Sequence, residues 1–257
     1  MTLTPLYNPD NGPMRIVGLM SGSGSNLRKI IEHERQLGSE TPYQMVALFA
    51  ENKESKVIPI AQEFDLPYIV RDMKEFYQAR ERLLTDMQVR AEFDRKTAEL
   101  LGQYDAPVAA FGGYMKLATA PLLNGFICVN VHPADLSIKR DDGLPRFTGD
   151  NAVRDAIKAG QQYLRATTHI MVEKADQGPL LMLSQPIEVV RGDTDLSDPV
   201  KLKALAEQHQ DQLKQAGDWI IFPQTLEGIA RGRYARDETG ALYFDGEKIP
   251  NGVRLEK

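Results

Sequence analysis

Asn130 and His132 are the two residues whose types and spacing point most directly to chemistry. They end an apolar run typical of a strand buried on both faces, and alternation along a strand puts both side chains on one side of the backbone. Pro133 then ends the strand, because proline lacks the N–H that a central sheet ladder needs. A side-chain amide and an imidazole presented together can polarise an oxygen and move a proton. A structural role, in packing or in capping the strand end, is the alternative for both.

A glycine-rich turn after the first apolar run predicts a second site. Residues 14–20 are typical of a buried strand, Ser-Gly-Ser-Gly-Ser-Asn follows, and apolar residues then recur at helical spacing. This order aims backbone N–H groups and the positive end of a helix at an anion, usually a phosphate. We expect the helix to begin near Ser25 or Asn26. A tight turn that needs glycine only for its backbone angles is the alternative.

Two common nucleotide-binding motifs do not fit this turn. Leu27 stands where a dinucleotide-binding fingerprint has its third glycine, which disfavours a Rossmann dehydrogenase. The turn is not a Walker loop either, because no Gly-Lys followed by Ser or Thr is present. The pattern therefore indicates a general anion-binding turn at the start of a helix.

The elements that must position these residues alternate between strands and helices. Strands are predicted over residues 14–20, 43–49, 67–70, 106–111, 126–132, 164–172 and 180–190. Helices are predicted from about residue 25, over 55–64, within 74–103, and over 150–159, 199–216 and 218–231, with Asp150 as an N-cap. A hairpin is predicted over 242–250. This alternation predicts an α/β fold: an open, mostly parallel, Rossmann-like twisted sheet with helices on both faces, and a C-terminal helix–hairpin extension.

Length and composition narrow the class of protein. At 257 residues, with 42% hydrophobic and 26% charged residues, the chain suits a globular protein with a substantial core. We expect a flexible lead-in over residues 1–13 and a single domain over 14–257. The net charge of −5 gives no support to a nucleic-acid or membrane-surface role, and no apolar run is long enough to cross a bilayer.

The single cysteine, Cys128, lies in an apolar run, so we expect a buried thiol and not a nucleophile. One cysteine excludes an intrachain disulfide and suits a reducing cytoplasm, where we place the protein. Of the histidines, His169, in its predicted strand, is interpreted as a packed residue or as one that supports a site residue. His33 and His209 are interpreted as surface residues.

Several segments, taken in order along the chain, resemble the motifs of the folate-dependent formyltransferases. Ile16–Leu27 resembles their first strand and phosphate loop, and Phe111–Lys116 resembles their Gly-Phe-Met-Arg-type segment. Val129–Pro133 resembles their Asn-x-His-Pro site, and Asp176–Pro179 resembles their Asp-x-Gly-Pro loop. Phe222-Pro223 with Gly232-Arg233, followed by Tyr243–Gly246, resembles their closing helix and hairpin. The order and spacing of these segments together carry the resemblance.

The resemblance implies a formyl transfer. The formyl group would pass from N10 of 10-formyltetrahydrofolate, the co-substrate, to the primary amine of a phosphorylated substrate. Glycinamide ribonucleotide of de novo purine synthesis is the first candidate. The amine is itself the nucleophile, so the reaction needs neither a Ser or Cys nucleophile nor a metal. Asn130 and protonated His132 would stabilise the negative charge that attack places on the formyl oxygen, and Asp176 would lie near His132 and orient it or a bound water.

The resemblance also assigns residues to roles. The catalytic set is Asn130, His132 and Asp176. The binding residues are Gly24, Ser25 and Asn26 for the substrate phosphate, Asp218 for the substrate amine, and Met115, Lys116, Leu117, Glu173, Gln177 and Arg80 for the folate. The half 14–125 would thus bind the phosphate, and the half 126–257 would carry catalysis and bind the folate.

Departures from the family pattern leave the acceptor amine open. Extra residues lie between His132 and Gly149, Thr148 replaces a usual proline, and Asn151 and Val153 stand where relatives often have histidines. Lys116 also replaces a frequent arginine, which binds carboxylates differently. The alternatives are transfer to another amine, such as an amino-sugar nucleotide, hydrolysis of 10-formyltetrahydrofolate to release formate, and a non-catalytic binding module. We expect small-molecule substrates and either a monomer or a homodimer.

Overall fold

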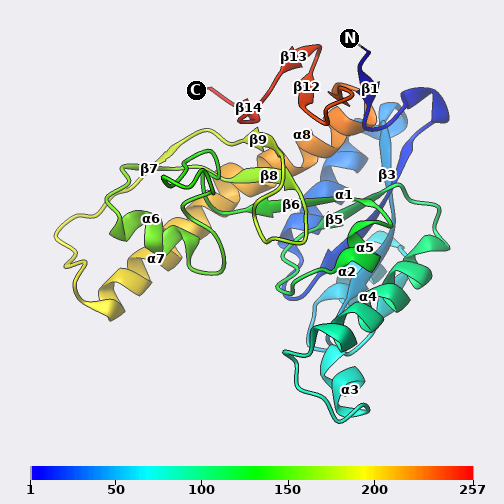
Figure 1. Cartoon of the computed structure of the whole chain (residues 1–257), viewed down its shortest axis with the longest axis horizontal. Coiled ribbons are helices and arrows are strands. Elements are labelled where there is room, and N and C mark those ends of the chain that lie inside the picture. The colour runs from blue at the N-terminus through cyan, green and yellow to red at the C-terminus, as the bar shows by residue number, and fades with distance from the viewer. Residues whose placement is uncertain (1, 257) are drawn as a thin grey trace. The chain divides into compact units, whose positions relative to one another are not determined.

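A computed structural model describes residues 2–256 of the chain (Figure 1). The chain divides into two compact units, which we call the N-terminal and the C-terminal unit. The N-terminal unit comprises Pro5–Asn130 and Leu226–Gly232, and the C-terminal unit comprises Met1–Thr4, Val131–Thr225 and Arg233–Lys257. No helix within residues 2–256 is both long and apolar enough to span a membrane.

The N-terminal unit is built on a parallel sheet. Its strands, in the order in which they pair, are β6 (Ile127–His132, as far as Asn130), β5 (Val108–Phe111), β2 (Met14–Met20), β3 (Tyr43–Ala50) and β4 (Tyr68–Val70). Most of their side chains are buried, as in a sheet covered on both faces. The strands end in Met20, Ala50, Phe111 and Asn130, so the segments that follow leave the sheet from its carboxyl edge, where open α/β sheets bind ligands.

Helices connect the strands of this unit. They are α1 (Ser25–Leu37), α2 (Val57–Phe64), α3 (Met73–Gln78), α4 (Met87–Gly102) and α5 (Ala120–Leu123), and β1 (Thr4–Pro5) with a 3-10 turn (Pro9–Asn11) precedes β2. Two of the helices begin at aspartates whose carboxylates cap their first turns: Asp72 accepts from the N–H of Glu75, and Asp86 from that of Gln88.

The strands of the C-terminal unit are shorter and mixed in direction. After the last two residues of β6 come β8 (Thr167–Ile170), β9 (Leu180–Leu183) and β14 (Val253–Arg254). Strands β8 and β9 pair antiparallel, whereas β14 and β9 pair parallel. Two smaller sheets are β7 (Tyr163–Leu164) with β10 (Ile187–Glu188), and a four-stranded sheet in the order β1, β11 (Tyr234–Arg236), β12 (Leu242–Phe244) and β13 (Glu247–Lys248). The hairpin β12–β13 confirms the one predicted from the sequence.

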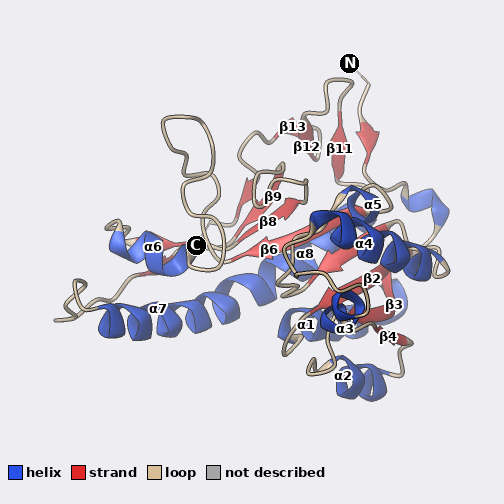
Figure 2. Cartoon of the chain, turned by 60° about the horizontal axis from the view of Figure 1, so that its bottom comes forward, coloured by secondary structure: helices blue, strands red, loops and turns tan. Residues whose placement is uncertain are grey.

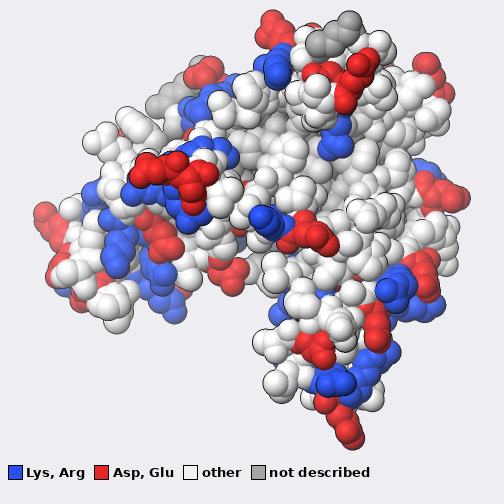
Figure 3. All heavy atoms as spheres, viewed as in Figure 1, with Lys and Arg blue, Asp and Glu red and all other residues white. Residues whose placement is uncertain are grey.

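Two helices of the C-terminal unit, α6 (Ala152–Lys158) and α7 (Pro199–Leu213), lie side by side (Figures 1 and 2). Asp198 caps α7 and Pro199 occupies its first turn, where the missing proline N–H costs nothing. A π-helical turn (Lys214–Asp218) joins α7 to α8 (Trp219–Ala230), which runs from one unit into the other. On the visible face, basic and acidic side chains are interspersed over α6 and α7 (Figure 3).

The predicted fold class is confirmed, and three local predictions are wrong. The N-cap of α6 is Asn151, not Asp150, and within the described chain its side chain makes no capping bond. The strands predicted over residues 164–172 and 180–190 are each divided into two short strands in the structure. At the division the N–H of Ala166 donates to the side-chain oxygen Ser184 Oγ, at 2.9 Å, in place of a backbone oxygen. His209 is buried, and its Nε2 accepts from the N–H of Val190 at 3.0 Å.

Candidate active site

The C-terminal unit brings two histidines to one carboxylate. Asp176 Oδ1 lies 3.5 Å from His132 Nδ1 at the end of β6 and 3.7 Å from His169 Nε2 on β8. Both imidazoles are buried, and the Asp176 side chain is only 10% exposed. These distances exceed those of direct hydrogen bonds, so in this geometry the groups interact mainly through charge. Contacts of this kind often tighten when a substrate binds.

The other nitrogen of each imidazole faces a backbone carbonyl. His132 Nε2 lies 3.0 Å from the oxygen of Phe147, and His169 Nδ1 lies 3.2 Å from the oxygen of Ile170. A carbonyl oxygen only accepts, so both of these nitrogens carry protons. In a neutral imidazole the remaining nitrogen is then a bare acceptor. Two bare acceptors facing the Asp176 carboxylate would repel it.

Burial lowers the pKa of both imidazoles. It lowers the pKa of His169 to about 4, so this imidazole is neutral at pH 7. Burial also lowers the pKa of His132, whereas the Asp176 carboxylate, the Phe147 carbonyl and the Asp150 carboxylate favour its charged form. With its Nε2 proton on the Phe147 carbonyl, a neutral His132 turns the lone pair of Nδ1 toward the Asp176 carboxylate, whereas a charged His132 turns an N–H toward it.

Tight backbone packing holds the loop that carries Asp176. Asp176 itself has φ +57°, a left-handed conformation that aspartate adopts more readily than most residues. A Cβ on Gly178 would lie 1.7 Å from the backbone oxygen of Ile170, so only glycine fits there. The N–H of Ile170 donates to the Pro179 oxygen at 2.9 Å, and the N–H of Gly149 donates to Asp176 Oδ2 at 2.9 Å. The Gly149 N–H thus fixes the carboxylate itself, and the bond between Ile170 and Pro179 fixes the loop that carries it.

Asn130 lies two residues before His132 on β6, half-buried, and ends the first of the two segments that make up the N-terminal unit. Its register partner on β5 is Phe111, the last residue of that strand. The strand geometry therefore places the Asn130 amide at the carboxyl edge of the parallel sheet, on the same side of β6 as His132.

The glycine-rich turn of the N-terminal unit leads directly into α1, which begins at Ser25 as predicted. Gly24 has φ +66°, and a Cβ there would lie 2.4 Å from Met20 Cε and 2.7 Å from Ile60 Cδ1. The first backbone N–H groups of α1 have no partner within the helix and point outward from its positive end. This is the geometry of an anion-binding turn.

The same turn is tied to the segment after β5. Ser21 Oγ accepts from the N–H of Met115 at 2.8 Å, and the N–H of Ser21 donates to the Gly113 oxygen at 3.0 Å. Gly112 lets Leu27 pack closely, because a Cβ there would lie 2.7 Å from Leu27 Cγ. Two motifs that lie far apart in the sequence thus form one structural element of the N-terminal unit.

Comparisons with known proteins decide the family. The model of the family described as formyl transferase matches residues 14–211, which is more than half of the chain. The chain belongs to the formyl transferase family.

Relatives in this family include enzymes of purine synthesis. The human trifunctional purine biosynthetic protein adenosine-3 is 27% identical over 253 residues, which are 96% of this chain and 21% of that protein. The chain therefore spans about a fifth of the length of that relative. The phosphoribosylglycinamide formyltransferase of Mycobacterium tuberculosis is 28% identical over 194 residues, covering 74% of this chain and 79% of that enzyme. The structure of phosphoribosylglycinamide formyltransferase from Coxiella burnetii has the same fold, with a TM-score of 0.71, 22% identity, and 95% and 99% coverage of the two chains.

The residues that the formyl transferase resemblance assigned to folate lie in different settings. Met115 and Leu117 are apolar yet 59% and 54% exposed, and Lys116 between them is exposed as well. Glu173 and Gln177 are exposed on either side of Asp176 in the C-terminal unit.

Arg80 and Asp218 have protein partners that limit what they can offer a ligand. Arg80 Nε lies 3.0 Å from Glu92 Oε2, and its guanidinium stacks on the Phe76 ring at 3.6 Å. Asp218 is buried in the π-helical turn between α7 and α8. Among residues 2–256, no group of three or more His, Cys, Asp or Glu side chains is arranged to hold a metal ion.

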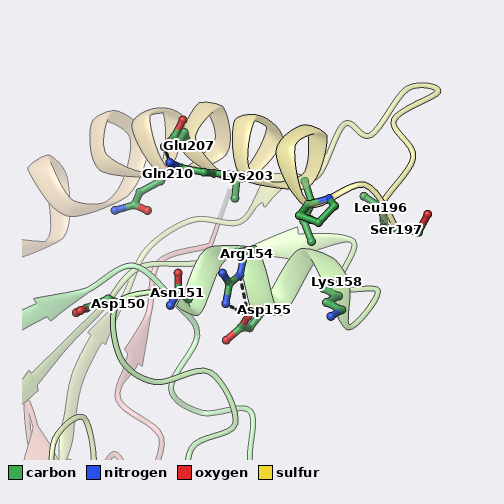
Figure 4. Close-up of a pocket in the computed structure, with 13 residues that line it drawn as sticks. Asp150, Asn151, Arg154, Asp155, Lys158, Leu196, Ser197, Lys203, Glu207 and Gln210 are labelled. Atoms are coloured by element: carbon green, nitrogen blue, oxygen red, sulfur yellow. Dashed lines mark hydrogen bonds and ion pairs between the residues drawn. The ribbon is translucent and has the colours of Figure 1, made fainter.

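A pocket of about 610 Å³ lies between α6 and α7 (Figure 4). Its walls carry charges of both signs, from Arg154, Lys203 and Glu207 among others, and it contains none of the predicted site residues. Asp150 and Asn151 at one end follow Gly149, the residue whose N–H holds Asp176. We do not place the chemistry in this pocket, because the titratable cluster lies outside its walls.

Sequence reasoning missed two backbone groups, whereas it allowed His169 a supporting role. The Phe147 carbonyl and the Gly149 N–H have no signature in the sequence, because any residue can supply them. His169 carried a usable signal, since it lies on the strand just before the Asp176 loop. A buried histidine there faces whatever that loop presents.

Proposed function

We propose that this chain transfers the formyl group of 10-formyltetrahydrofolate to the primary amine of glycinamide ribonucleotide, as in de novo purine synthesis. The observation that carries the proposal is the Asp176 carboxylate beside His132, 3.5 Å away, in a member of the formyl transferase family. Relatives named for this reaction support it. We place the protein in the cytoplasm, because its single cysteine, Cys128, can form no intrachain disulfide and suits a reducing compartment.

The reaction requires charge stabilisation and one proton transfer. The amine nitrogen attacks the formyl carbon, the carbonyl oxygen gains negative charge, and the bond from the carbon to folate N10 then breaks. Asn130, through its side-chain NH2, is our donor to that oxygen. Loss of a donor of this kind costs on the order of 10²–10³ in kcat.

The proton must move from the attacking amine to the leaving N10. His132 is buried with Nε2 on the Phe147 carbonyl and Nδ1 toward Asp176, so we assign it to positioning the Asp176 carboxylate. Asp176, partly open to solvent, then accepts the amine proton through a bound water and returns it to N10. His169 closes the other side of the carboxylate.

We assign the binding of the substrate phosphate and of the pterin to residues whose chemistry suits each group. The first N–H groups of α1, at Ser25 and Asn26 after Gly24, would hold the substrate phosphate. Exposed Met115 and Leu117 offer apolar surface for the pterin. The same proposal assigns folate binding to Lys116, Glu173, Gln177 and Arg80, and binding of the substrate amine to Asp218.

The test is a folate absorbance assay with 10-formyltetrahydrofolate. Glycinamide ribonucleotide, other amines such as an amino-sugar nucleotide, or buffer alone are supplied in parallel. We expect folate turnover only with glycinamide ribonucleotide, and a loss of at least about 100-fold in kcat in Asn130→Ala and in Asp176→Asn. Asp211→Asn, at an exposed aspartate on α7, is the matched control and should keep wild-type rates.

Two outcomes would replace the proposal. Turnover with another amine and none with glycinamide ribonucleotide would assign a different acceptor, in keeping with the altered loop between His132 and Gly149. Turnover in buffer alone would indicate a hydrolase. A wild-type rate in either Asn130→Ala or Asp176→Asn would remove that residue from the mechanism.

A further inference from the structure

The loop that departs most from the family pattern returns to the Asp176 cluster. We call residues 133–149 the inserted loop. It leaves β6 directly after His132 and comes back so that the Phe147 carbonyl accepts from His132 Nε2 at 3.0 Å. Two residues later, the N–H of Gly149 donates to Asp176 Oδ2 at 2.9 Å. One loop therefore touches both His132 and Asp176.

The middle of the inserted loop is a regular hairpin. Lys139 and Pro145 form an antiparallel bridge, and the N–H of Arg140 donates to the Leu144 oxygen at 2.9 Å. The N–H of Arg146 donates to the Ile138 oxygen at 2.9 Å. A hairpin bonded in this way transmits the position of its first arm to its second arm. The placement of Phe147 thus depends on what holds the residues before Ile138.

Two anchors hold that first arm. Thr167 on β8 donates to the Ala134 oxygen at 2.6 Å and accepts from the N–H of Leu136 at 3.2 Å, inside the core. From the outer side, Arg254 donates to Ser137 Oγ at 2.7 Å. Arg254 also lies 4.0 Å from the largely buried Asp135 carboxylate, which in turn accepts from the N–H of Ser137 at 2.9 Å.

The strand that carries Arg254 is itself fixed to the strand that follows the Asp176 loop. In β14, Arg254 is the register partner of Leu183 on β9, and the N–H of Leu255 donates to the Leu183 oxygen at 3.0 Å. Strand β9 starts at Leu180, directly after Pro179. Arg254 therefore ties the inserted loop to the same strand that positions Asp176.

We propose that Arg254 is a positioning residue: through Ser137 and Asp135 it sets the inserted hairpin, and thereby keeps the Phe147 carbonyl on His132 and the Gly149 N–H on Asp176. The catalytic consequence rests on the proposed function, whereas the structural coupling does not. An exposed ion pair alone contributes little to stability, so a purely structural Arg254 would leave the distant pair unchanged. The coupling predicts a change at His132.

The first measurement is a side-chain ¹⁵N NMR titration of the full-length protein, whose four histidines can each be assigned with single His→Gln variants. The ring nitrogen shifts report which nitrogen carries the proton. In Arg254→Met we expect the His132 midpoint to move by at least about half a pH unit and its Nε2–H signature to weaken. His33, which is bonded to Glu227, and His209, which is bonded to Val190 and Leu205, serve as references in the same spectra.

The second measurement is formyl transfer by the same variants. Arg254→Met should lower kcat on the order of tenfold, with KM for the amine within about twofold, because misplacement of reacting groups acts on the chemical step. Arg254→Lys should restore part of the rate. Ser137→Ala should resemble Arg254→Met, and the double variant should be no worse than either, since both break one connection.

Arg154→Met is the matched control, because Arg154 is 43% exposed and paired with Asp155 on α6, while Arg254 is 41% exposed. An unchanged His132 titration in Arg254→Met, or additive effects in the double variant, would overturn the proposal. Wild-type protein that transfers no formyl group would instead overturn the proposed function, and the NMR titration would still decide the coupling.

Discussion

The glycine-rich turn of the N-terminal unit and the Asp176 cluster of the C-terminal unit are built in opposite ways. The turn uses consecutive residues, Gly24 to Asn26, and its chemistry comes from backbone N–H groups at the start of α1. The cluster draws His132, Phe147, Gly149, His169 and Asp176 from separate segments. A local site depends on local backbone angles, whereas an assembled site depends on every segment that supports it.

The largest effect is expected for Gly178→Ala in the Asp176 loop, which tests whether the assembled site depends on its supporting segments. The new Cβ would lie 1.7 Å from the Ile170 oxygen, and backbone must move to admit it. We expect a loss of about 3 kcal/mol in the free energy of unfolding and a fall in kcat on the order of 100-fold. Urea unfolding and the folate assay measure the two effects.

Gly102→Ala, at the end of α4, is the control for Gly178→Ala. A Cβ on Gly102 meets nothing within 4 Å, so stability and kcat should stay near the wild-type values. A Gly178→Ala protein as stable and active as the control would show that the loop tolerates rearrangement, against the assembled character of this site.

Gly24→Ala tests the local site and should have a smaller effect. Its left-handed φ and the close approach of Met20 and Ile60 side chains predict a loss of about 2 kcal/mol in the free energy of unfolding, because flexible side chains can partly move aside. We expect KM for the phosphorylated substrate to rise several-fold while kcat changes less. Steady-state kinetics with varied amine separates the two constants.

Gly22→Ala sharpens the result, because Gly22 lies in the same turn and a Cβ there meets nothing within 4 Å. It should change KM less than Gly24→Ala does. If both variants lower kcat and leave KM unchanged, the turn acts in the chemical step and the assignment to phosphate binding is wrong.

The smallest expected effect is the change in stability over a single pH unit that originates in the cluster. The pKa of His169 is lowered by burial to about 4, from an ordinary value of about 6.5. Between these values the unfolded chain binds the proton and the folded chain does not, so the free energy of unfolding falls as the pH drops from about 6.5 toward 4. Urea unfolding at a series of pH values measures this slope.

His169→Gln should reduce that slope by at most about 1.4 kcal/mol per pH unit, the value for one proton. Carboxylates elsewhere contribute equally to both proteins, so the difference between them isolates His169. The pKa of about 4 already includes the opposing effect of the Asp176 carboxylate and the added effect of His132. Identical slopes would show that His169 does not titrate in this window.

Much of the fold could be predicted from the sequence, because its signals are local. Apolar runs marked β2, β3, β5 and β6, and glycines after a strand marked the start of α1 at Ser25. Prediction failed where a side chain bonds to the backbone of a segment distant along the chain. Ser184 Oγ accepts from the N–H of Ala166 where the predicted strands are interrupted, and buried His209 accepts from the N–H of Val190.

By itself the sequence determined which groups are available to this protein: an amide and an imidazole at a strand end, an aspartate before Gln-Gly-Pro, and a glycine turn before a helix. Tertiary structure alone decided their states. Which nitrogen of His132 carries a proton depends on the Phe147 carbonyl, and the position of that carbonyl depends on a hairpin held by Arg254. Residue types are local properties, whereas the field and the hydrogen bonds at a buried atom are set by segments distant along the chain.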